Sequence, residues 1–248
     1  MKRKKIRLDE KIRTEGLIEE KMIIPMVMAG EVWADGQRAI SPSQPVYIDC
    51  SIEIRGLNGK KYVGRGGLKL EAALEQFEIT PTDYVCIDFG ACTGGFTDVL
   101  LQKGAKKVYA LETGKGILAD KLRNDPRVIN LEGMNLYKFE QNYTEIIDEK
   151  INLCVVDLSF IPLTHALDKI SVISNNAPII ALLKPHYEAQ DESLLSRGVV
   201  KDDETRNMIV ENFKNWLEQN NYSLTGFIES PIHGGGGNIE YLVKVQKI

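Results

Sequence analysis

The spacing of hydrophobic residues changes near residue 68 of this chain. Beyond that point, short apolar runs of strand length alternate with stretches typical of helices. Strands are predicted at residues 84–89, 107–112, 127–131, 152–157, 178–184, 223–230 and 239–246, and helices at residues 68–77, 96–103, 116–123, 163–173 and 203–220. This alternation predicts an α/β fold with a doubly wound, mostly parallel sheet. No helix separates the last two strands, so that pair should be antiparallel.

The first 55 residues follow a different pattern, that of a small mixed module. Helices are expected at residues 6–16 and 17–28, and Pro25 should kink or shorten the second one. Residues 31–36 predict a strand that enters an Asp-Gly hairpin turn, and short strands should follow at 46–48 and 51–54. Residues 56–66 are rich in glycine, lysine and arginine. We therefore predict a module at 1–57, a linker at 58–66 and a larger domain at 67–248.

The composition is that of an ordinary globular protein, with 43% hydrophobic and 27% charged residues. The length of 248 residues is enough for one large domain and one small module. No apolar run is long enough for a membrane span, and the basic N-terminus lacks the apolar segment of a signal peptide. We expect a cytoplasmic protein without a membrane partner. Four cysteines without CxxC spacing and three scattered histidines make a metal site unexpected.

Charge is distributed unevenly. The net charge is −4, yet residues 1–13 carry seven basic and two acidic residues. A basic arm on an acidic protein is typical of a contact with a phosphate backbone, although a solvated terminus would look the same. The candidate RNA contacts are Lys4, Lys5, Arg7, Lys11, Arg13 and, in the linker, Arg65.

A glycine-rich loop follows the first strand of the larger domain, in the stretch VCIDFGACTGGF. Its glycines allow a ligand to approach the backbone closely, and ligands of open α/β sheets bind beyond the carboxyl ends of the strands. Glu112 ends the next strand, where a carboxylate can bind ribose hydroxyls. The loop has no basic residue, which favours a nucleoside cofactor without pyrophosphate, such as S-adenosylmethionine. The candidate cofactor residues in the loop are Asp88, Gly90, Ala91, Cys92, Thr93, Gly94, Gly95 and Phe96.

Four charged residues occupy positions near strand ends. Asp157 and Lys184 end predicted parallel strands, Glu240 opens the last strand, and Lys69 precedes the sheet. An antiparallel last strand begins where the parallel strands end, so these side chains should meet at one edge. They could form a structural ion-pair cluster or transfer protons. Burial and a second ammonium lower the pKa of a lysine and make it a general base, whereas a carboxylate between the lysines raises it again.

Seven segments of the chain, in order, resemble the TlyA group of ribosomal RNA 2′-O-methyltransferases. These proteins are often named hemolysins and are related to the FtsJ methyltransferases. The segments are YVGRGGLKL, DFGACTGGFTDVLLQKGAKKVYALE, KLRNDPRV, VVDLSFIPL, ALLKPHYEA, GVV and GNIEYL. The resemblance implies a Rossmann-like methyltransferase domain. It also implies that RLDE…EGL…MAGEVWADGQ belongs to an αL (S-four type) RNA-binding domain.

The resemblance also implies roles for particular residues. Lys69, Asp157, Lys184 and Glu240 would form a catalytic tetrad in which Lys184 is the base or orienter of a ribose 2′-hydroxyl. Asp157 would lie near the methyl group that is transferred. Lys69 and Glu240 would tune and position the reacting groups. S-adenosylmethionine would be the cofactor, with Glu112 on its ribose and Asn135 among its contacts. The substrate would be a cytidine in ribosomal RNA of ribosomal subunits. Tyr187 could stack on a base or simply pack.

Other classes of function fit less of the sequence. A non-catalytic RNA-binding assembly factor has no need of lysine at a strand end. A membrane-lytic hemolysin would need a signal or an amphipathic membrane segment. A small-molecule methyltransferase would need neither the basic arm nor the module. The sequence does not set the modified nucleotide or the oligomeric state.

Overall fold

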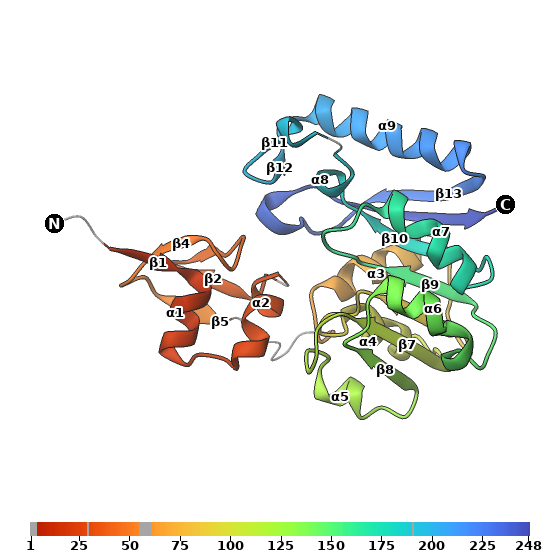
Figure 1. The fold of residues 1–248 in the computed structure, drawn as a ribbon, viewed down its shortest axis with the longest axis horizontal. Helices are drawn as coiled ribbons and strands as arrows, with labels where there is room; N and C mark the ends of the chain where they lie inside the picture. The colour runs from red at the N-terminus through yellow and green to blue at the C-terminus, as the bar shows by residue number, and fades with distance from the viewer. Residues whose placement is uncertain (1–3, 29, 55–60, 190) are drawn as a thin grey trace.

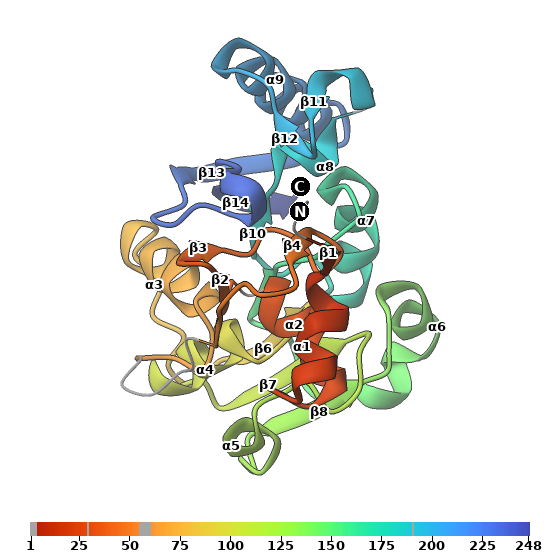
Figure 2. The same ribbon diagram turned by 90° about the vertical axis from the view of Figure 1, so that its left-hand side faces the viewer.

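The computed structural model describes residues 4–28, 30–54, 61–189 and 191–248. Figure 1 shows a small N-terminal module, red to orange, beside a larger α/β part. Figure 2 gives the view from the side of the module.

The N-terminal module contains two helices and short strands. Its elements are β1 (Lys5–Arg7), α1 (Leu8–Glu15), α2 (Glu20–Met28), β2 (Val32–Ala34), β3 (Gln37–Arg38), β4 (Pro45–Tyr47) and β5 (Ile52–Ile54). β1 pairs with β4, and β2 pairs with β3 and β5. The predicted Asp-Gly hairpin is confirmed, since Asp35 and Gly36 both have positive φ between β2 and β3. Leu8, Ile12, Ile23, Val27 and Val32 belong to a core of the module's own.

Two helix boundaries in the module differ from the prediction. Residues 5–7 form β1 because they pair with β4, so α1 begins at Leu8 rather than at residue 6. α2 begins at Glu20 rather than at residue 17, since Gly16 ends α1 in a left-handed conformation and a turn follows. Pro25 lies inside α2.

The larger part is built on a seven-stranded sheet in the order β13-β14-β10-β9-β6-β7-β8. Its strands are β6 (Val85–Phe89), β7 (Lys107–Glu112), β8 (Val128–Glu132), β9 (Leu153–Val156), β10 (Ile179–Leu183), β13 (Tyr222–Glu229) and β14 (Tyr241–Lys247). Five of them, from β10 to β8, are parallel. β14 lies antiparallel to both β10 and β13. The doubly wound sheet with an antiparallel last strand is therefore confirmed.

Hydrophobic cores cover both faces of this sheet. Val85, Ile87 and Phe89 of β6 face one core, and Cys86 faces the other, as alternation along a strand requires. The helices are α3 (Gly66–Gln76), α4 (Gly95–Gln102), α5 (Asp120–Arg123), α6 (Leu136–Ile146), α7 (Leu163–Ile173), α8 (Pro185–Glu188) and α9 (Asp203–Gln219). Figure 1 shows α6 and α7 near each other and α3 with α4, on opposite faces of the sheet.

Several elements were not predicted. α6 was missed, although Leu136, Phe139 and Tyr143 recur at helical spacing and pack on the core. α5 is shorter than predicted because Glu132 accepts hydrogen bonds from the backbone of Ile117 and Leu118 and holds that segment as a loop. The hairpin of β11 (Leu195–Ser196) and β12 (Val199–Val200) was also missed.

Residues 61–65, expected to be linker, pack into the larger part. Tyr62 and Val63 are buried in one of its cores, and the Val63 amide donates to Asp98 Oδ2 at 2.8 Å. Of the rest of the predicted linker, Gly66 is the first residue of α3, and residues 58–60 lie outside the described residues.

Candidate active site

The site lies where the order of strands reverses. The chain runs from β6 outward to β7 and β8, then returns to β9 and continues to β10 on the other side. The loops after β6 and β9 are therefore far apart along the chain but touch in space. At Gly90, where φ is +88°, a Cβ would lie 2.5 Å from the carbonyl oxygen of Asp157. Crevices at such switch points are the usual ligand sites of open α/β sheets.

A cavity of about 150 Å³, open to solvent, occupies this position. It is lined by six loop residues that we predicted to bind cofactor, namely Gly90, Ala91, Cys92, Thr93, Gly95 and Phe96. All four predicted catalytic residues, Lys69, Asp157, Lys184 and Glu240, line it too. The structure thus brings together residues from 69 to 240 of the chain.

Asp88 supports the loop from below rather than lining the cavity. It is fully buried, and its Oδ2 accepts hydrogen bonds from the amide and the hydroxyl of Thr97, at 2.9 and 2.7 Å. Its Oδ1 has no hydrogen-bond partner. Burial raises the pKa of Asp88 to about 7.

Glu112 fixes the shape of the loop. Its Oε2 accepts a hydrogen bond from the amide of Cys92 at 2.9 Å, and its Oε1 accepts one from Gly114 at 2.8 Å. Cys92 adopts φ +51°, so this bond stabilises a conformation that side-chain-bearing residues rarely take. Glu112 is not among the residues that line the cavity, and it contacts the loop through these backbone amides.

Two predicted cofactor residues point elsewhere. Gly94, with φ +98°, faces the side chains of Leu118 and Leu122. Asn135 is exposed, and its side chain accepts a hydrogen bond from the Lys138 amide at 2.8 Å as the N-cap of α6. That cap is the local role that Asn commonly has at a helix start. Because α6 was not predicted, the N-cap role of Asn135 was not predicted either.

The cavity wall suits a nucleoside cofactor. A Cβ at Gly64 would lie 2.7 Å from Thr93 Oγ1, and one at Gly95 would lie 3.0 Å from the Gly67 amide nitrogen. Glycine at both positions therefore lets residues 64–67 pack directly against the loop, which lines the cavity beside them. The loop itself carries no cationic side chain for a pyrophosphate.

The tetrad consists of two ion pairs, of which Lys69–Glu240 is buried and Lys184–Asp157 is buried except for part of the aspartate. Lys184 Nζ lies 2.6 Å from Asp157 Oδ1, and Lys69 Nζ lies 2.6 Å from Glu240 Oε2. Asp157 follows β9, Lys184 follows β10, and Glu240 precedes the antiparallel β14. Leu183 and Tyr241 are paired across β10 and β14, which places Lys184 and Glu240 at the same edge. The predicted meeting of these residues at one edge is confirmed.

The pKa of Lys184 depends on opposing effects. We expected burial and a second ammonium to lower it and a nearby carboxylate to raise it again. Burial does act in that direction, but the carboxylates of Asp157 and Glu240 outweigh it and raise the pKa of Lys184. Burial raises the pKa of Asp157 in turn, but Lys184 and Lys69 outweigh it and leave that pKa below its ordinary value. Without bound cofactor or RNA, Lys184 is therefore an ammonium and Asp157 a carboxylate at neutral pH.

The glycine run before β14 is an ordered turn. Residues Gly235–Gly237 form a short 3₁₀ turn. The buried Asn238 donates through Nδ2 to the carbonyls of Gly198 and Gly235, each at 3.0 Å, and accepts from the Val200 amide at 3.2 Å. Gly234 contacts the Glu240 carboxylate so closely that a Cβ there would overlap it.

An aromatic pair lies beside Lys184. Phe160 is 76% exposed and has φ +67°, and its ring centroid is 5.7 Å from that of Tyr187. Lys184 Nζ lies 5.6 Å from the Tyr187 ring centroid. Burial and the charges of Lys184 and Lys69 lower the pKa of His186, also on the cavity wall, to about 4. Phe160 was not predicted as part of the site, since the exposure of one aromatic residue in a loop cannot be read from the sequence.

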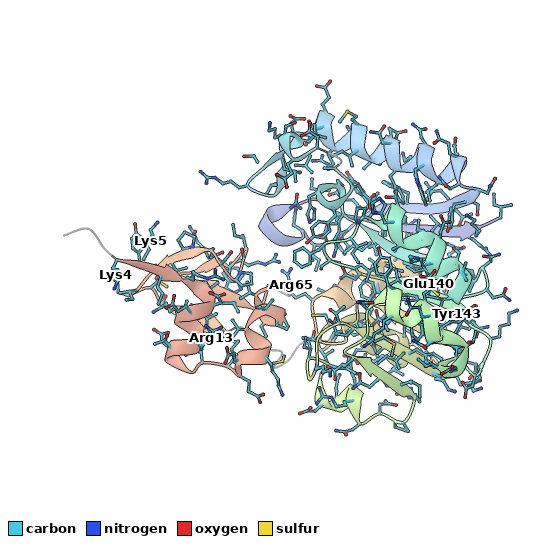
Figure 3. The ribbon with its side chains drawn as sticks, in the orientation of Figure 1. Lys4, Lys5, Arg13, Arg65, Glu140 and Tyr143 are labelled. Atoms are coloured by element: carbon cyan, nitrogen blue, oxygen red, sulfur yellow. The ribbon has the colours of Figure 1, made fainter. Side chains whose placement is uncertain are left out.

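The predicted RNA contacts are spread across the molecule. Lys4 and Lys5 are exposed at the outer end of the module, and Arg65 lies between the two parts (Figure 3). The exposed Arg7 and Arg13 pair with Asp9 and Glu20.

Lys11 corrects one of these predictions. It is 4% exposed, and its ammonium donates to the Ile48 carbonyl at 2.7 Å and to Glu15 at 2.6 Å. We therefore remove it from the set of phosphate contacts.

The fold and the site together define the class. The protein has an open sheet with an antiparallel β14, a glycine loop after the first strand of the sheet, and a charged edge. These features are typical of S-adenosylmethionine-dependent methyltransferases. The sequence model of the FtsJ-like methyltransferase family matches residues 62–247, and the chain belongs to this family.

Similar proteins carry related names. Hemolysin A of Brachyspira hyodysenteriae is 37% identical over 239 residues, which cover 96% of this chain and 98% of that protein. The 16S/23S rRNA (cytidine-2′-O)-methyltransferase TlyA of Mycobacterium tuberculosis is 35% identical over 242 residues, or 97% and 89%. A solved structure, of a candidate hemolysin from Streptococcus thermophilus, is 35% identical with a TM-score of 0.73 and covers 98% of this chain and 88% of its own.

Proposed function

We propose that this protein transfers a methyl group from S-adenosylmethionine to a ribose 2′-hydroxyl of ribosomal RNA. The observation that carries this proposal is the pair of largely buried lysine–carboxylate contacts beside the glycine loop. Ion pairs of this kind are costly to bury and are replaced by apolar residues at little cost, so stability alone does not account for two of them at one edge. Ribosomal RNA and cytidine are supported by the similarity to TlyA of M. tuberculosis.

The loop backbone, with Glu112 behind it, would hold the cofactor. When bound, S-adenosylmethionine supplies a methyl group activated by a sulfonium charge. Asp157 stands at the boundary between the loop and the charged edge, close to where that methyl would lie.

Lys184 is suited to orient the hydroxyl. Lysine has three N–H donors, and two of them point to the Leu158 carbonyl at 2.8 Å and to Asp157. The third can hold the ribose 2′-oxygen in line with the methyl group. Because Lys184 has a raised pKa in this state, orientation fits it better than the role of base.

The proton leaves the oxygen as the new O–C bond forms. The attacking oxygen becomes strongly acidic during transfer, so even the low-pKa carboxylate of Asp157 can receive its proton. Lys69 and Glu240 would keep the electrostatic field at this edge fixed during the reaction.

The substrate locates the reaction in the cytoplasm, where ribosomal subunits occur. The exposed Lys4 and Lys5 of the module would contribute phosphate contacts. The αL assignment of the module agrees with such a role.

A lytic function is a weaker candidate. It rests on the name of the Brachyspira relative. In the part of the chain that the structure describes, no helix combines the length and hydrophobicity required to span a membrane.

Mapping of 2′-O-methyl groups on ribosomal RNA, with and without this protein, tests the proposal. A site should be lost on deletion, restored by the parent chain and not restored by Lys184→Met, which keeps an apolar stem of similar length. An unchanged map would refute the proposed reaction. Full restoration by Lys184→Met would instead remove Lys184 from the mechanism.

A further inference from the structure

The wall of the catalytic cavity includes residues from the N-terminal module. Val27 of α2, Arg38 of β3, and Ala39 and Ile40 after it line the cavity together with the tetrad. Figures 1 and 2 show the module standing at the side of the larger part, with α2 at its inner end. The site is therefore composite.

Six charged side chains line this cavity among the described residues. They are Arg38, Arg65, Lys69, Lys184, Asp157 and Glu240. The two lysines pair with the two carboxylates. The arginines therefore add positive charge beyond the tetrad, part of which Glu31 offsets through its electrostatic effect on both.

Arg38 is half-buried and makes few hydrogen bonds. Its Nε is enclosed by protein without a hydrogen-bond partner, and its Nη1 reaches the His233 carbonyl only at 3.5 Å. Burial and the charge of Arg65 both lower the pKa of Arg38, so the two cations repel each other. Two neighbouring cations on a cavity wall favour an anion in the cavity.

We propose that Arg38 and Arg65 form a subsite for an RNA phosphodiester, at the junction of the N-terminal module and the catalytic cavity. This inference rests on the proposed function. In RNA the carbon that bears the 2′-hydroxyl is bonded to the carbon that bears the 3′-phosphate. A cavity that positions this hydroxyl beside Lys184 must therefore also accept a phosphodiester nearby.

The alternative anion is the carboxylate of the cofactor. The position of Arg38 favours the phosphodiester, because it comes from the module that carries the exposed Lys4 and Lys5, whereas the cofactor loop belongs to the larger part. The Nε of Arg38 is enclosed by protein, so its Nη groups are the donors left for phosphate oxygens.

The test compares the full-length parent with Arg38→Gln and Arg38→Lys. The control is Lys214→Gln, which removes one positive charge from α9, outside the cavity. Affinity for ribosomal subunits from cells lacking this protein is measured over a range of salt concentrations, and S-adenosylmethionine affinity by calorimetry. Circular dichroism verifies that each variant keeps the parental fold.

Arg38→Gln should weaken subunit affinity about 10-fold and reduce the salt slope by about 1, with cofactor affinity unchanged. Arg38→Lys should keep the slope but recover only part of the affinity, since lysine lacks the fork. Equal subunit affinity for all variants would overturn the subsite. Weaker cofactor binding with parental subunit binding would assign the anion to the cofactor and also overturn it.

These measurements distinguish a failure of the subsite from a failure of the proposed function. A parent protein that binds subunits but transfers no methyl group would refute the reaction, and the affinity comparison would still decide the subsite. Normal transfer with unchanged affinity in Arg38→Gln would refute only the subsite.

Discussion

Two aspartates at this site have opposite pKa shifts, and their partners explain the difference. Asp88 is fully buried and accepts hydrogen bonds from the amide and hydroxyl of Thr97, and burial raises its pKa to about 7. Asp157 is half-buried, and Lys184 and Lys69 keep its pKa low. The same residue type therefore supports the loop at one position and carries charge at the other.

Stability should depend on pH through Asp88. Its pKa is raised on folding from an ordinary 3.8 to about 7, so the folded state binds more protons than the unfolded state between these values. Stability is therefore lost as pH rises through that window, by about 1.4 kcal/mol per pH unit. We expect the free energy of unfolding to fall by about 3 kcal/mol from pH 5 to pH 8 through this residue alone.

Urea unfolding of the parent and of Asp88→Asn at both pH values measures this effect. The asparagine does not titrate, so the difference between the two proteins isolates Asp88. An identical pH dependence in both proteins would show that Asp88 is ionised throughout.

Glu240 should act through Lys69. Glu240→Gln removes the charge partner of a buried ammonium, which should cost on the order of 3 kcal/mol of stability. It should lower the single-turnover rate at saturating RNA and cofactor on the order of 100-fold, because the charged edge loses its geometry. Cofactor affinity should stay at the parental value.

The double variant Lys69→Met with Glu240→Gln separates stability from catalysis. Removal of both charges should restore stability, since no unpaired charge stays buried, but should not restore the rate. A parental single-turnover rate for Glu240→Gln would make the pair purely structural.

At the scale of elements, the direction of β14 decides what the glycine run does. Because β14 is antiparallel to β10, the chain enters it at the edge where the parallel strands end. The turn before it must place Glu240 against Lys69. Asn238 holds this turn to the β11–β12 hairpin, so the glycines provide close packing at this edge rather than a loose hinge.

Gly234→Ala should displace the Glu240 carboxylate. The residue has φ −72°, so alanine brings no backbone strain, but its Cβ would overlap the carboxylate. The single-turnover rate should fall at least about 10-fold with cofactor affinity unchanged. Gly235→Ala is the matched control, since nothing lies within 4 Å of a Cβ there. Equal rates for both variants would contradict the need for close contact at Gly234.

At the scale of the whole molecule, two parts with their own cores meet at one cavity. Leu8, Ile12 and Val32 belong to the core of the module, while the sheet carries two cores of its own. The module adds only part of the cavity wall. Cofactor binding and RNA binding should therefore be separable.

A chain of residues 61–248 should fold and bind S-adenosylmethionine. It begins at residue 61 because Tyr62 and Val63 belong to the core of the larger part. Its affinity for ribosomal subunits should be on the order of 100-fold lower and should depend less steeply on salt. Calorimetry and subunit binding measure the two properties, with Lys4→Gln/Lys5→Gln in the full chain as a charge control. Parental subunit affinity after truncation would show that the module does not bind the RNA.

The hydrophobic pattern by itself determined most of the large sheet. Its inner strands β6, β9 and β10 are buried along their whole length and form nearly continuous apolar runs, and all seven strands were predicted near their observed limits. The strand ends in turn predicted where Asp157, Lys184 and Glu240 would meet. Short elements such as α8 and β11 were missed, because contacts between distant segments stabilise them more than local propensity does.

Only the tertiary structure decided how the charged residues pair and which cations line the cavity. No local sequence pattern predicts that Lys184 pairs with Asp157 and Lys69 with Glu240. Nor does one predict that Lys11 is buried or that Arg38 lines the cavity. Each of these facts depends on burial and on partners far away in the chain. The pKa of Lys184 shows the physical reason: burial and the nearby carboxylates act in opposite directions, and only the folded distances determine which effect is larger.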